Sequence, residues 1–131
     1  MPITVHRDEK RRLITATAAG RLTVDEGFHF LEEHWVTAGA DYAILLDARD
    51  MIVDQTASDV RALVSRVERH SDTIRAPFAI VVGTDITADH AFGMARMYEM
   101  LLETAGISLV RVFRSVADAK AWLGIEPPLI G

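Results

Sequence analysis

Polar side chains that could bind a ligand or move a proton follow the apolar runs 42–46, 77–82 and 109–113. If these runs are parallel strands, their carboxyl ends meet at one edge of a sheet, and the connectors after them share a crevice. Each connector also leads into a helical pattern, whose free N–H groups favour an anion. The candidate binding residues in these connectors are Asp47, Arg49, Asp54, Gln55, Thr56, Ser58, Asp85 and His90.

The same residue types have an ordinary structural use, because Asp, Thr and Ser before a helix cap its first turn. A hydrolase or transferase using Asp47 or Asp54 with His90 is the catalytic alternative, since a carboxylate and an imidazole can exchange protons near neutral pH. The spacing around Asp47 and Asp54 matches no known metal-binding loop. We therefore assign no catalytic residue, metal or cofactor and favour a non-enzymatic binding site.

The composition excludes several classes of protein. The 131 residues include no cysteine, which rules out disulfide scaffolds, thiolate zinc sites and cysteine nucleophiles. Nineteen acidic against fourteen basic side chains give a net charge of −5, which argues against nucleic-acid binding. No apolar stretch approaches the ~20 residues of a membrane span, and the start lacks a signal peptide, so we expect a cytoplasmic protein. Glycine-rich phosphate and dinucleotide motifs, Gly-x-Ser-x-Gly and His-Glu-x-x-His are also absent.

Hydrophobic periodicity predicts nine elements in the order β-β-α-β-α-β-α-β-α. Runs 3–5 and 13–18 form a hairpin, and the alternation in the second run suits an edge strand. A helical stripe runs from Val24 to Ala38, with Thr23 or Asp25 as its cap and Gly39 as its stop. Later helices are expected from Thr56 or Ser58, over 87–105 and from Ser115 to Leu123, with strands at 42–46, 77–82 and 109–113.

Strands that alternate with helices pair in parallel through right-handed crossovers. We therefore predict an α/β fold: a single layered domain over residues 1–124 with a mixed, mostly parallel five-stranded sheet. Residues 125–131 contain two adjacent prolines and are predicted to be a short tail.

The expected helix over 87–105 has an unusual outer face. Its inward stripe contains the side chains Ala91, Met94, Tyr98, Leu101, Leu102 and Ala105. Phe92, Arg96 and Met100 lie on the opposite side at steps of four, with Glu99 and Glu103 beside them. Large apolar side chains flanking an arginine are either ordinary exposed residues or the contact surface of a homodimer or partner protein.

Three stretches of the sequence carry a family resemblance: Gly20-Arg-Leu-Thr-Val-Asp-Glu26, Ala43-Ile-Leu-Leu-Asp47, and the run from Gly106 through Phe113 to Leu123. They resemble the SpoIIAA-like family of STAS-type domains. The resemblance covers residues 3 to 124 and implies a right-handed superhelix of βα units that works as a regulatory or partner-binding module. In anti-sigma-factor antagonists it also implies a phosphorylated serine in a motif like Asp-Ser-Ser-Gly. Here that stretch reads Asp54-Gln-Thr-Ala57, so a phosphate switch would have to use Thr56 or Ser58, or the chain works without one.

Related CRAL/TRIO domains suggest a different role, in which a lipid or other apolar ligand lies between helices and sheet. A chain of this length has room only for a small pocket. Its expected lining is Phe28, Trp35, Met94, Tyr98 and Trp122. The same side chains would also serve a closed core, which is the default because protein interiors are densely packed. The expected partner is thus a protein or a small apolar or anionic ligand.

Overall fold

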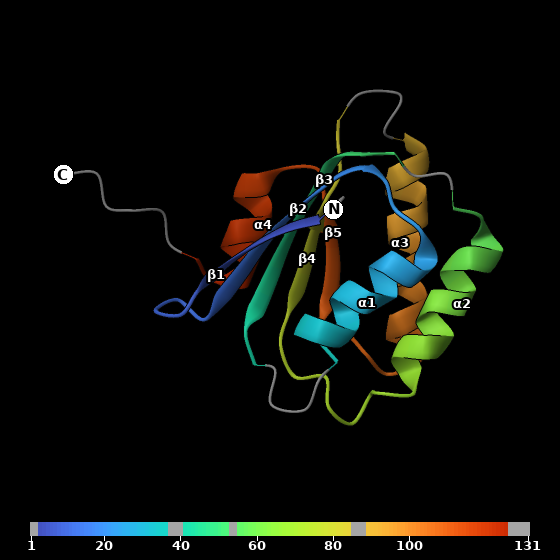
Figure 1. Ribbon diagram of the computed structural model, residues 1–131, viewed down its shortest axis with the longest axis horizontal. Helices are drawn as coiled ribbons and strands as arrows, with labels where there is room; N and C mark the ends of the chain where they lie inside the picture. Colours follow the sequence, from blue (N-terminus) through green and yellow to red (C-terminus); the bar gives the residue numbers. More distant parts are fainter. Residues whose placement is uncertain (1–2, 37–40, 53–54, 85–88, 126–131) are drawn as a thin grey trace.

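The computed structural model describes residues 3–36, 41–52, 55–84 and 89–125 (Figure 1). Five strands form one sheet in the order β1-β2-β3-β4-β5. The elements are β1 (Ile3–Asp8), β2 (Leu13–Arg21), α1 (Val24–His34), β3 (Ala43–Ile52), α2 (Ala57–Glu68), β4 (Phe78–Val81), α3 (Asp89–Thr104), β5 (Val110–Phe113) and α4 (Val116–Leu123). The predicted α/β class, element order and mixed sheet are confirmed. Within these ranges, no helix is both long enough and apolar enough to span a bilayer.

Strand β1 pairs antiparallel with β2, and every later pair is parallel. The prediction that the second strand occupies the edge of the sheet is wrong. Strand β1 takes that edge, and β2 lies between β1 and β3, with Ile14, Ala16 and Ala18 fully or almost fully buried.

The connecting helices are unevenly divided between the two faces of the sheet. Helices α1, α2 and α3 lie on one face and α4 lies on the other (Figure 1). The strands follow one another in chain order, so three right-handed crossovers in succession place their helices on the same side. Helix α2 is the outermost and packs on α1 and α3, whereas α3 also packs directly on β5.

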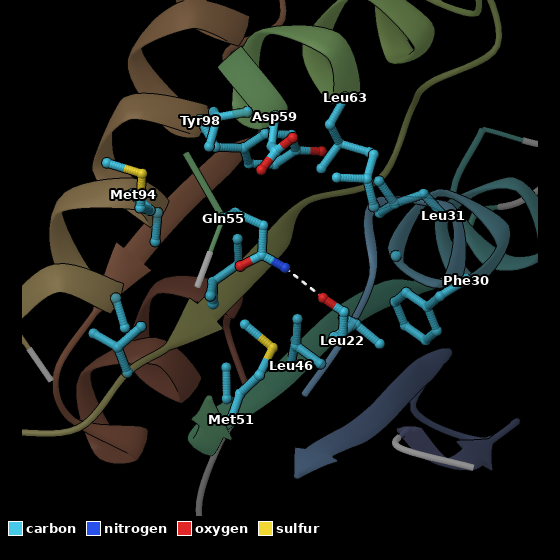
Figure 2. Close-up of a pocket in the computed structure, with 18 of the residues that line it drawn as sticks. Leu22, Phe30, Leu31, Leu46, Met51, Gln55, Asp59, Leu63, Met94 and Tyr98 are labelled. Atoms are coloured by element: carbon cyan, nitrogen blue, oxygen red, sulfur yellow. Dashed lines mark hydrogen bonds between the residues drawn. The ribbon is translucent and has the colours of Figure 1, made fainter. Parts of the chain in front are cut away.

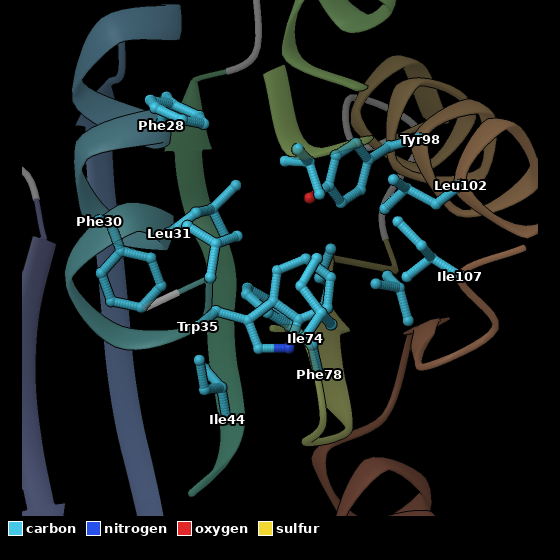
Figure 3. Close-up of a cluster of buried hydrophobic side chains, with 14 of the residues drawn as sticks. Phe28, Phe30, Leu31, Trp35, Ile44, Ile74, Phe78, Tyr98, Leu102 and Ile107 are labelled. Atoms are coloured by element: carbon cyan, nitrogen blue, oxygen red, sulfur yellow. The ribbon is translucent and has the colours of Figure 1, made fainter. Parts of the chain in front are cut away.

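The main core lies under these three helices (Figure 3). Trp35 is fully buried at 0% exposure, and its ring meets Phe78 edge to face with centroids 5.2 Å apart. Its indole Nε1 donates to the carbonyl oxygen of Ala76 at 2.8 Å, so the polar atom of this large side chain is satisfied. A smaller core on the other face joins Ala119 of α4 to Leu45 and Val81.

Local sequence explains where the helices begin. Thr23 and Thr56 cap α1 and α2 with complete capping boxes. Each threonine side chain accepts a backbone N–H three residues later, and the side chain of that later residue, Glu26 or Asp59, accepts the backbone N–H of the threonine. Ser115 caps α4 by accepting from the backbone N of Asp118, as predicted. Gly124 ends α4 in the left-handed conformation, with φ of 75°.

Two predicted boundaries differ from the structure. Helix α1 ends at His34 with Trp35 as its C-cap, before the predicted end near Ala38, and Gly39 lies outside the described residues. Strand β3 runs to Ile52, whereas the prediction stopped it at Leu46. It continues because β2 keeps pairing with it past a register shift, as far as Arg21 opposite Ile52. Ile125 packs on the α4 core, and the rest of the predicted tail lies outside the described residues.

Glu99 in α3 was placed on the outer face of its helix, and that assignment is wrong. The residue is 7% exposed, its Oε1 accepts from the backbone N of Val112 at 2.8 Å, and its Oε2 pairs with Arg96. Ala105, expected inside, is exposed. Strand β5 is an edge strand of the sheet, so the backbone N–H of Val112 has no strand partner on the outer side, and Glu99 accepts it instead.

We expect Glu99→Ala to lower the free energy of unfolding by roughly 2 kcal/mol, because it removes a charge-assisted hydrogen bond and leaves the N–H of Val112 without its acceptor. Glu99→Gln keeps a side-chain oxygen acceptor and should lose about half as much. Urea unfolding measures both, with exposed Glu103→Ala in the same helix as control. Equal small losses for Glu99→Ala and Glu103→Ala would contradict the assignment.

Candidate functional site

An apolar cavity of about 140 Å³, partly open to solvent, lies between the sheet and helices α1, α2 and α3 (Figure 2). Strands β3 and β4 form its floor through Leu46, Ala48 and Ile80, and Leu31 of α1 and Met94 of α3 contribute to its sides. The further lining residues on which the argument depends are Phe30, Met51, Leu63, Phe78, Ala91, Ala95 and Tyr98.

Most polar side chains of the lining lie at one end of the cavity, where α1 and α2 begin. Thr23 and Asp59 are engaged in the two capping boxes. The side-chain Nε2 of Gln55 donates to the carbonyl oxygen of Leu22, which ties the segment before α2 to the segment before α1 (Figure 2). These three polar side chains therefore already have partners within the protein.

Tyr98 is the exception. Its side chain lines the cavity from α3, is 6% exposed, and its hydroxyl oxygen is shielded from water without a hydrogen-bond partner among the described residues. Burial raises the pKa of this hydroxyl far above its usual value, so the group stays protonated. Figure 3 shows the hydroxyl directed away from α3. A buried hydroxyl without a partner costs about 1–3 kcal/mol, which makes it unusual in a folded protein.

The predicted pocket lining is right for Met94 and Tyr98. Phe28 and Trp35 belong to the surrounding core and are not among the lining residues. Trp122 is on the opposite side of the sheet, where its ring lies 5.7 Å from that of Phe113. The sequence analysis missed the lining from β3, although Leu46 and Ala48 alternate with Leu45 and Asp47 and so mark one face of a strand.

The first turn of α3 lies close to the described residues that precede α2 and to the residue that follows β5. The ring Nε2 of His90 lies 3.3 Å from the backbone oxygen of Gln55. Arg114, after β5, pairs with Asp89 at the start of α3 at 2.9 Å. Thr56 is occupied as a helix cap, and Ser58 is exposed in the first turn of α2. Asp54 and Asp85 lie outside the described residues.

Asp47 and Arg49 were expected in the connector, and this placement is wrong because both belong to β3. Asp47 follows Leu45 by two residues and so faces the α4 side of the sheet. Arg49 donates to Asp47 through Nε at 2.9 Å and Nη2 at 2.7 Å. These hydrogen bonds hold the pKa of the Asp47 carboxyl below its usual value. The sheet separates this ion pair from His90, which leads α3 on the other face.

No group of three or more histidine, aspartate or glutamate side chains within the described ranges is arranged to hold a metal ion.

The outer face of α3 is less exposed than its sequence suggested. Met100 is 56% exposed, and Arg96 is exposed but paired with Glu99. Phe92 is half-buried against the core and lies under the guanidinium of Arg114, 4.2 Å from the ring centre. These three residues do not form a continuous exposed apolar stripe, and their use in a homodimer stays a prediction.

Comparison with known proteins identifies the fold. One similar solved structure is an uncharacterised protein of the DUF3478 family with a SpoIIAA-like fold, from Shewanella loihica PV-4. It shares 17% sequence identity, the alignment covers 92% of this chain and 91% of that one, and the TM-score is 0.53. The chain therefore has a SpoIIAA-like fold, as the sequence resemblance implied. No family model and no curated protein matches the sequence.

We expect Thr56→Ala to destabilise the protein by about 1 kcal/mol, because Thr56 Oγ1 accepts the backbone N–H of Asp59 at 3.2 Å. Ser58→Ala should change the stability by no more than ~0.5 kcal/mol, since this side chain is an exposed surface position. Chemical denaturation of the two variants makes the comparison. If both lose the same amount, Thr56 is not acting as a cap and is free for another role.

A second prediction concerns the charge of Asp47. Because Arg49 lowers the pKa of Asp47 in the folded protein, the carboxylate stabilises the fold above the ordinary pKa of ~3.9 and loses this effect as pH falls through the lowered folded value. Arg49→Gln should move the NMR titration midpoint of Asp47 up toward its ordinary value. Arg61→Gln, on exposed α2, is the control and should leave it unchanged. An unaltered midpoint in Arg49→Gln would refute the pairing.

Proposed function

We propose that this chain is a non-enzymatic binding module that holds a small apolar molecule between its sheet and helices α1 to α3. The observation that carries the proposal is the apolar cavity of about 140 Å³. Its near-continuous hydrocarbon and thioether lining offers water few hydrogen bonds, so an apolar ligand competes well with water there. A ligand that fills it gains the dispersion contacts that the lining otherwise lacks.

The side chains around the cavity also support a ligand. Small residues surround it, including Gly27, Ala48, Ala91 and Ala95, so a few larger side chains would close it. At Gly27 an added Cβ would meet only Leu22 Cδ2 at 3.8 Å, an ordinary contact. The sequence thus keeps open a space that simple substitutions could fill.

A protein partner at the connector end is a second proposal. Contacts from Gln55 to Leu22 and His90 bring together the described residues just before α1 and α2 and the first turn of α3, beside the exposed Ser58. A partner bound there would cover the polar end of the cavity, so the two proposals are compatible.

We expect benzene to bind in the cavity of the wild-type protein. At ten times its Kd it should stabilise the fold by about 1.4 kcal/mol, which corresponds to a rise in Tm of roughly 5 °C. Methyl NMR spectra should show shifts at Leu46, Leu63 and Met94, which line the cavity.

Two variants control for binding elsewhere. Ala95→Leu adds three carbons at the cavity wall and should abolish the benzene shift, whereas Ala62→Leu adds them on the exposed face of α2 and should preserve it. The absence of any benzene effect on the wild type, or an equal effect on Ala95→Leu, would overturn the proposal.

A further inference from the structure

We infer that the ligand is an uncharged, ring-sized molecule with one hydrogen-bonding group, of the phenol class, and that this group binds the hydroxyl of Tyr98. The inference rests on the proposed binding function and specifies its ligand. Four properties of the cavity carry it: its charge, its volume, the shape and softness of its walls, and its one free polar group.

The charge of the lining argues against an ionised ligand. Among the described lining residues there is no lysine, arginine or histidine, and the one ionisable carboxylate is Asp59. An anionic ligand such as a fatty acid would find no cation to replace its hydration and would meet a negative charge. Asp59 is half-buried and already accepts the backbone N–H of Thr56 at 2.9 Å, so it belongs to the cap of α2. A buried ammonium would lose more hydration than this engaged carboxylate returns.

The volume sets the size of the ligand. A cavity of about 140 Å³ is close to the ~150 Å³ of an engineered apolar cavity in another protein that takes up benzene or xenon. A single ring with one small substituent therefore fills it, whereas a long acyl chain does not fit.

The walls favour a ring over a short flexible chain of the same volume. Three aromatic residues, Phe30, Phe78 and Tyr98, line the space together with two thioethers, Met51 and Met94. Thioether sulfur and ring edges make favourable contacts with an aromatic guest. A rigid ring also loses less conformational entropy on binding than an alkyl chain of equal size.

The free polar group sets where the substituent points. Thr23, Gln55 and Asp59 already have partners, whereas the hydroxyl of Tyr98 has none among the described residues. Because the hydroxyl is shielded, a ligand reaches it by displacing neighbouring side chains, and flexible methionine and leucine side chains such as Met94 and Leu63 can change rotamer for this. A phenolic or carbonyl oxygen placed there would satisfy a donor that folding leaves unsatisfied.

The test compares four probes, benzene, phenol, benzoate and benzylamine, on the full chain and on Tyr98→Phe, with affinities measured by NMR titration. Phenol should bind the wild type about 3- to 10-fold more tightly than it binds Tyr98→Phe, since the variant lacks one hydrogen bond. Benzene should bind both proteins equally, and benzoate should bind the wild type more weakly than phenol. The unliganded Tyr98→Phe protein should keep or raise its Tm, because it loses only a hydroxyl without a partner.

The outcomes separate this inference from the proposed function. If benzene and phenol bind but Tyr98→Phe leaves the phenol affinity unchanged, the inference fails and the binding function stands. Tighter binding of benzoate, or of benzylamine as a cationic probe, also overturns the inference. A Tyr98→Phe protein that is clearly less stable shows that the hydroxyl already has a partner, which overturns it too. If none of the probes binds the wild type, the proposed function itself fails.

Discussion

The order of the strands constrains the rest of this structure. Strands β2 to β5 are parallel and adjacent in chain order, so each right-handed crossover leaves its helix on the same face. Helix α3 packs directly on β5, whereas α2 packs on α1 and α3 and lies outside them (Figure 1).

The cavity follows from this arrangement. Where α2 bridges α1 and α3, its side chains must fill the space above β3 and β4, and Val60 and Leu63 fill only part of it. Small residues on the facing strand and helix, such as Ala48 and Ala95, leave the remainder open. The cavity on which the proposed function rests is thus a consequence of topology together with a few small side chains, and Tyr98 adds a buried hydroxyl that has no partner among the described residues.

The sequence predicted the features that local rules determine. Capping residues such as Thr56 and Ser115 and the stop at Gly124 marked helix ends, and apolar runs marked the strands, so the element order followed. The errors arose where tertiary contacts determine the length of an element or the burial of a side chain. Pairing with β2 extends β3 through the charged Asp47 and Arg49, and the exposed edge of β5 draws Glu99 inward. Which residues line the cavity depends on how three helices pack over the sheet, and hydrophobic periodicity alone does not predict that packing. Met94 and Tyr98 were placed correctly because they lie on the inward stripe of one helix, whereas Phe28, Trp35 and Trp122 were wrongly assigned to the pocket.

The most direct test of this account is a crystal structure of the protein under xenon pressure. Xenon has no charge and no hydrogen-bonding capacity, so it reports only whether an apolar space exists beneath α2. The account predicts a xenon atom in contact with Leu46 and Met94, with the surrounding backbone unmoved. Side chains of α2 and α3 closed over β3 and β4, or ordered water in place of xenon, would contradict it.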